Sequence, residues 1–118
     1  MKSTSIIERI EYAAQNGVFE ISLYVWNKTA QKLHKEGFTL TETKIKNVRK
    51  GEGHYLISWK DSYNVPNHNL NLNDLTQSVI ETTGSISVDT LLKTFSERHI
   101  EITAANRMWL IAATSKSK

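Results

Sequence analysis

The segment VFEISLYVW, residues 18–26, decides the fold of this chain. Apolar side chains occupy every second position of the segment, at Phe19, Ile21, Leu23 and Val25. This period of two is the pattern of a β-strand with one buried face. Such a strand needs a cover on its apolar side, and it turns Tyr24 and Trp26 toward the opposite side.

A helix that can supply the cover precedes the strand. Residues 6–14 place isoleucines and alanines at helical spacing, which predicts one apolar stripe. Ser5 and Glu8 form a capping-box pattern, in which each side chain satisfies a backbone amide of the first turn. Gly17 ends the helix, because glycine adopts the left-handed conformation at little cost.

A second helix and a hairpin follow the strand. The pattern predicts a helix over 28–36 with Asn27 as its cap and Gly37 at its end, and Phe38 packing back onto Leu33. Residues 38–48 and 54–60 are typical of two hairpin arms, and the turn between them contains two glycines.

The second half of the chain has helical character. An asparagine-rich connecting loop covers 61–74, and Leu70 and Leu72 hold it to the body. Three helices follow, with a polar cap before each and a frayed tail over 115–118. We expect them over 75–82 after Asp74, over 88–98 after Ser87 and over 103–114 with Thr103 as cap.

Together these elements predict one α+β domain over residues 1–118. Residues 1–60 form a three-stranded antiparallel sheet with the N-terminal helices on one face. Residues 75–114 form a helical subdomain that packs against it. The order of the strands stays open.

Composition excludes several classes of function. The 118 residues include no cysteine, which removes disulfides, thiolate nucleophiles and cysteine-based zinc sites. The longest apolar run, 108–113, is too short to span a membrane. The four histidines lie too far apart to form a metal motif, and no catalytic motif is present. We therefore expect a soluble protein that is not an enzyme and that uses no metal and no organic cofactor.

The charge is concentrated in the first half. Residues 1–60 carry ten Lys and Arg against six Asp and Glu, a net charge of +4 within a total of +3. Lys44, Lys46, Arg49 and Lys50 cluster at the hairpin and could contact phosphates, with Tyr55 or Trp59 stacking on a base. The alternative, which we favour, is a charged arm that prevents edge pairing.

The helices predicted over 88–98 and 103–114 have the dimensions of a helix-turn-helix, since a four-residue turn joins them. The second helix offers only Asn106 and Arg107 as base readers, beside large apolar residues. We favour a packing role for it and keep DNA reading as a degenerate alternative.

The pair Tyr24 and Trp26 is the candidate protein-binding site. Aromatic side chains of this kind are enriched at the energetic centres of interfaces. The alternative is that the C-terminal helices cover this face of the strand and make Trp26 a core residue.

The first half resembles small α+β proteins encoded by bacteriophages and prophages, mostly of unknown function. The residues that carry the resemblance are Ile10, Ala13, Ala14 and Gly17, the run LHKEGF over 33–38, and LISW over 56–59. The likeness covers residues 5–60. It implies a viral protein in the host bacterial cytoplasm that binds a host or phage protein as a host-takeover factor, inhibitor or minor virion component. A homo-oligomer is compatible with this, and a small nucleic-acid-binding regulator is the alternative.

Overall fold

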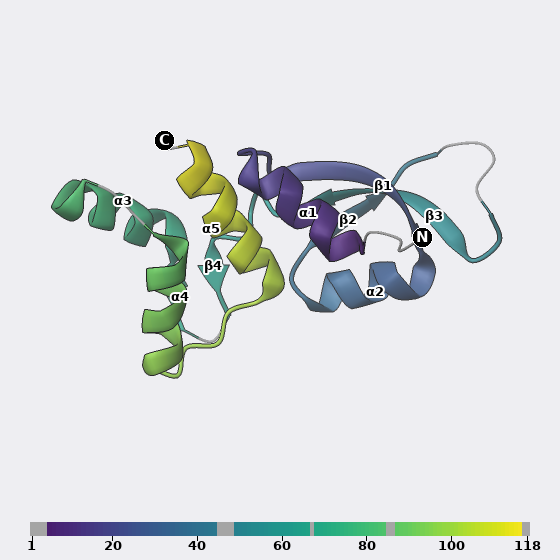
Figure 1. Ribbon diagram of the computed structural model, residues 1–118. Helices are drawn as coiled ribbons and strands as arrows, with labels where there is room; N and C mark the ends of the chain where they lie inside the picture. The colour runs from purple at the N-terminus through teal and green to yellow at the C-terminus, as the bar shows by residue number, and fades with distance from the viewer. Residues whose placement is uncertain (1–4, 45–48, 67, 85–86, 117–118) are drawn as a thin grey trace.

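The computed structural model describes residues 5–44, 49–66, 68–84 and 87–116, and it shows an α+β fold (Figure 1). The elements in chain order are α1 (Ile6–Gln15), β1 (Glu20–Trp26), α2 (Asn27–Lys35), β2 (Thr39–Glu42), β3 (Glu52–Ser58), β4 (Asn64–Val65), β5 (Leu70–Asn71), α3 (Leu72–Thr83), α4 (Val88–Glu97) and α5 (Ala104–Lys116). Of the helices described, none is long and apolar enough to cross a membrane.

The N-terminal helix begins and ends as predicted. The Ser5 hydroxyl oxygen accepts a hydrogen bond from the Glu8 backbone N–H at 3.2 Å. Gly17 has φ 77°, the left-handed conformation expected of a residue that ends a helix. Ile10 and Ala14 are fully buried, so the predicted stripe forms part of the core.

The three-stranded antiparallel sheet has the order β1-β3-β2, which the sequence left open. Its register pairs Leu23 with Tyr55 and Tyr24 with His54. Helices α1 and α2 both contact the sheet, and they pack against the face that carries Val25 and Ile57. The predicted cover of the strand by the N-terminal helices is therefore confirmed.

The helical part of the chain extends the molecule along the sheet instead of covering its second face. Helix α5 packs along α1, and α3 and α4 lie beyond it, at the end opposite the β2–β3 hairpin (Figure 1). The principal extents are 51 × 30 × 28 Å. Trp109 of α5 joins the two parts, with its ring 6.3 Å from that of Phe19 and 6.2 Å from that of Tyr63.

Two predicted caps were wrong. Helix α2 begins at Asn27, so Trp26 occupies the cap position and the Asn27 side chain instead accepts a hydrogen bond from the Tyr55 hydroxyl at 3.1 Å. Helix α3 is capped by Asn71, not Asp74, because the Asn71 side chain accepts the N–H of Asn73 at 2.9 Å. Leu72, the first residue of α3, is fully buried, so the helix begins before Asp74.

Other boundaries also differ. The asparagine-rich segment is not an open loop throughout, because Asn64 pairs with Asn71 and Val65 with Leu70 in a small antiparallel pair, β4 and β5. Strand β3 begins at Glu52, so Gly53 belongs to the strand and not to the turn. Helix α5 extends beyond the predicted 103–114 through Ser115 to Lys116, where the Ser115 hydroxyl donates to the Gln15 carbonyl at 3.0 Å; the rest of the predicted tail, 117–118, lies outside the described residues.

Candidate functional site

The face of the sheet turned away from α1 and α2 is open. The side chains on it are exposed or half-buried, whereas Ile57 and Trp59 on the opposite face are fully buried. We call this surface the open sheet face, and its residues are Glu20, Ser22, Tyr24, Trp26, Thr39, Thr41, Thr43, Glu52, His54, Leu56 and Ser58. Tyr24 is 49% exposed and Trp26 is 52% exposed. The alternative that Trp26 is a core residue under the C-terminal helices is therefore wrong.

Tyr24 is held in place by its neighbours across the sheet. Its ring meets the His54 ring edge-on, with centroids 4.6 Å apart. The imidazole is itself fixed, because its Nδ1 is hydrogen-bonded to the Thr43 hydroxyl. Tyr24, His54 and Thr43 thus form one row across the sheet. Because their side chains already have a fixed orientation, less conformational entropy is lost when a partner binds.

Trp26 lies at the end of β1, where the strand passes directly into α2. The Asn27 N–H donates to the Gly51 carbonyl at 2.9 Å and fixes the backbone at this corner. A Cβ atom on Gly51 would lie 3.8 Å from the indole, so the ring lies against the backbone of the hairpin turn. One side of the indole is supported in this way, and half of its surface remains accessible.

Two of the hairpin cations, Arg49 and Lys50, lie in the turn against which Trp26 packs. Arg49 and Lys50 immediately precede Gly51, and Lys44 follows β2; all three side chains are exposed. Lys46 lies outside the described residues. The structure therefore brings together two sites that the sequence treated separately, because the antiparallel register places Trp26 opposite Glu52.

Tyr55 and Trp59 do not join this surface. Both side chains point to the face that α1 and α2 cover, since they have the opposite parity to His54 in β3. Trp59 is fully buried with its ring 6.2 Å from that of Phe38, so the expectation that it stacks on a base was wrong. Tyr55 is half-buried, and its hydroxyl is used by Asn27.

The structure supports the packing role that we favoured for α5 over the helix-turn-helix alternative. Asn106 is 2% exposed, and its amide donates to the Ser62 and Asn64 carbonyls. Arg107 pairs with Glu11 of α1 at 2.9 Å. Asn106 is therefore not available to a DNA groove, whereas Arg107 remains exposed beside Glu11.

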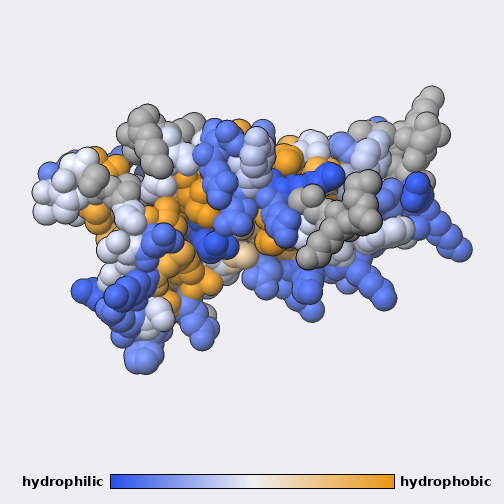
Figure 2. Space-filling model, in the orientation of Figure 1, coloured by the Kyte–Doolittle hydropathy of each residue, from blue (hydrophilic) through white to orange (hydrophobic). Residues whose placement is uncertain are grey.

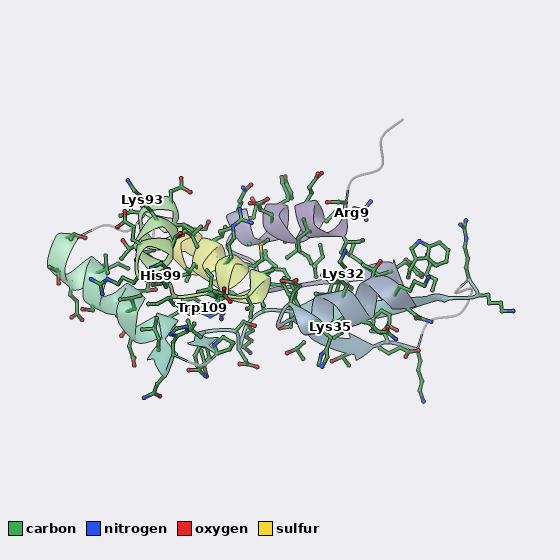
Figure 3. All side chains as sticks on the ribbon, turned by 90° about the horizontal axis from the view of Figure 1, so that it is seen from below. Arg9, Lys32, Lys35, Lys93, His99 and Trp109 are labelled. Carbon is green, nitrogen blue, oxygen red and sulfur yellow. The ribbon has the colours of Figure 1, made fainter. Side chains whose placement is uncertain are left out.

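Other charged groups do not extend the site. Figure 3 labels Arg9 on α1 and Lys32 and Lys35 on α2, the helices that cover the other face of the sheet. In Figure 2, apolar surface gathers around the helical end, whereas the visible hairpin end is mostly hydrophilic. Within the described ranges, no three His, Asp or Glu side chains come together to hold a metal ion.

Sequence reasoning found Tyr24 and Trp26 but missed His54 and Leu56, the other apolar or aromatic members of the open sheet face. A signal existed in the alternation of the second hairpin arm, where His54, Leu56 and Ser58 share a parity opposite to Ile57. Comparison of the chain with models of protein families, with curated proteins and with solved structures found no match.

Proposed function

We propose that this chain is a non-catalytic binding protein whose open sheet face contacts another protein. The observation that carries the proposal is the pair Tyr24 and Trp26, each about half exposed on a face that no described element covers. Exposed aromatic side chains with a fixed orientation are the usual anchors of a protein interface, because they bury much area and lose little entropy. The phage origin implied by the resemblance of residues 5–60 stays a prediction.

The charges on this face favour a protein partner over a nucleic acid. Glu20 and Glu52 flank the aromatic pair on the same face, and two carboxylates would repel a phosphate backbone laid across it. The neighbouring residues are mostly threonines and serines, which a protein partner can meet with hydrogen bonds. The surface thus has an aromatic centre and a polar border, as protein interfaces do.

Affinity capture from a bacterial host lysate tests the proposal. We expect wild-type protein to retain a partner and the double variant Tyr24→Ser, Trp26→Ser to release it while its circular dichroism spectrum is unchanged. Tyr12→Ser is the matched control, because Tyr12 is 71% exposed on α1, away from the open sheet face. Full retention by the folded double variant would refute the proposal, and so would equal loss in the control.

A small nucleic-acid-binding regulator is the second candidate, and the position of Trp26 beside Arg49 and Lys50 favours it. Single-stranded nucleic acids bind where an aromatic ring adjoins a cationic backbone site. Affinity for such a ligand falls steeply with salt, with a slope of about 0.7 per phosphate neutralised on a single strand. Substitution of Lys46, Arg49 and Lys50 by glutamate should abolish that binding. An affinity that changes neither with salt nor with these substitutions would exclude this candidate.

A further inference from the structure

Strand β1 has one free backbone edge. The Trp59 N–H donates to the Phe19 carbonyl and the Asn27 N–H donates to the Gly51 carbonyl, so the odd-numbered residues of β1 bond to β3. The backbone groups of Ser22 and Tyr24 therefore point away from β3. No described residue pairs with them there.

This edge lacks the features that protect edge strands. The seven residues EISLYVW contain no proline, no lysine and no arginine, and Glu20 is their single charge. Proteins whose edge strands stay unpaired usually shorten them or place proline or lysine on them. The length and composition of β1 are instead those of a strand that receives a neighbour.

We infer that the neighbour is a second copy of this chain, paired antiparallel through β1 with Leu23 nearest the two-fold axis. This register aligns all seven residues of both strands, so that Ser22 lies opposite Tyr24 and Glu20 opposite Trp26 of the other copy. The two three-stranded sheets then form one continuous six-stranded sheet.

The charges at the two ends of β1 complement each other in this arrangement. Glu20 stands at its start, where it lines a hollow together with Lys60, whereas Lys28 and Lys50 outnumber Glu52 at its end. A two-fold axis brings Glu20 of each copy toward this cationic end of the other. Opposite charges close to an interface favour the correct register and partner.

The shapes at the two ends also fit. A hollow lies at the start of β1, and its walls include Val18, Phe19, Glu20, Lys60, Tyr63 and Trp109. Val18 is 41% exposed at this hollow, and Trp26 is 52% exposed at the far end of the strand. The two-fold arrangement sets Trp26 of each copy diagonal to Val18 of the other on the same face of the joined sheet, so the two apolar side chains lie side by side and the indole face stays open.

This dimer deepens the proposed function, because it rests on the same face and doubles it. The open sheet faces of both copies lie on one side of the joined sheet, so a partner meets two sets of Tyr24 and Trp26. The pairing itself uses backbone groups, which separates its test from that of partner binding.

Light scattering on purified protein tests the dimer through Ser22→Pro. The Ser22 N–H has no partner among the described residues, so the variant loses none of the hydrogen bonds described but cannot donate across the interface. We expect twice the 13.5 kDa chain mass for wild type and for the control Ser22→Thr, and the single-chain mass for Ser22→Pro. A monomeric wild type, or a folded Ser22→Pro that stays dimeric, would overturn the inference.

Cross-linking fixes the register and decides the matter if Ser22→Pro does not fold. The chain has no cysteine, so Ser22→Cys and Tyr24→Cys each introduce the sole thiol. Residues directly opposite have Cα atoms about 5.5 Å apart, within disulfide range, and we expect a mixture of the two variants to cross-link under mild oxidation. Copies of Ser22→Cys alone should not, because their Cα atoms lie about 8 Å apart.

A disulfide in Ser22→Cys alone, or none in the mixture, would overturn the register. Capture of a partner protein by a wild type that proves monomeric would show that the dimer inference fails while the proposed function holds. If the double variant Tyr24→Ser, Trp26→Ser loses the partner but remains a dimer, partner binding and dimer formation are shown to depend on different groups.

Discussion

The substitution Asn106→Ala should destabilise the protein more than any change on its surface. Asn106 is 2% exposed and joins α5 to residues 62–64, where the chain enters β4. Its amide nitrogen donates to the Ser62 carbonyl at 2.8 Å and to the Asn64 carbonyl at 3.0 Å. Its side-chain oxygen accepts the Thr103 N–H at 3.0 Å. Alanine removes all three hydrogen bonds and leaves their partners without a replacement.

The magnitude follows from these three contacts. Each hydrogen bond that is lost at a shielded site costs about 1 kcal/mol, so the free energy of unfolding should fall by about 3 kcal/mol. That is a large part of the total, since domains of this size are stable by roughly 5–15 kcal/mol. The melting temperature should fall by about 10 °C.

Urea unfolding followed by circular dichroism measures the loss, with Asn73→Ala as the matched control. Asn73 is exposed in the first turn of α3, and its backbone N–H, which alanine keeps, makes the cap contact. The control should change stability by less than about 0.5 kcal/mol. If Asn106→Ala were as mild as the control, the three bonds would not hold this segment, and our account of α5 as a packing helix would fail.

Three further changes test the local arguments. Gly37→Ala should cost at least about 2 kcal/mol in urea unfolding, because φ is +95° and the new Cβ would lie 2.9 Å from the Thr103 hydroxyl; a smaller loss would show that neither constraint matters. Ser5→Ala should cost about 1 kcal/mol in thermal unfolding through the lost cap, and no loss would contradict the cap. A double-mutant cycle on Glu11 and Arg107 should give a coupling below about 1 kcal/mol that weakens with salt; a larger, salt-independent value would be inconsistent with a solvent-screened pair.

The elements that follow from local sequence were predictable. The alternation of residues 18–26 sufficed to place Tyr24 and Trp26 on the face opposite Val25, because the side chains of a strand alternate whatever their surroundings. Likewise, Gly37 followed by Phe38 predicted the end of α2, and the Phe38 N–H does bond to the Leu33 carbonyl at 3.1 Å. Each of these features depends on neighbours within a few residues.

Features that depend on distant residues were not predictable. That the cations adjoin Trp26 requires the β1–β3 register, which no local pattern specifies. Asn71 and Asp74 both carry a side-chain oxygen that can cap a helix. The burial of Leu72, which lies between them, accompanies the helix start at Asn71, and this burial depends on tertiary packing. The packing role favoured for the helix of Asn106 was predictable from its apolar neighbours, but the hydrogen-bond partners of Asn106, Ser62 and Asn64, were not, because they lie more than forty positions away.

The packing of α5 along α1 has a consequence for how the chain is made. The Glu11–Arg107 pair joins positions separated by 96 residues, and the Ser115–Gln15 bond spans 100. At bacterial and eukaryotic rates of synthesis, α5 leaves the ribosome roughly 5–20 s after α1. During that interval the nascent chain carries α1 without the helix that covers its alanines, Ala13 and Ala14. The sheet and α2 must hold α1 in place until translation delivers its partner.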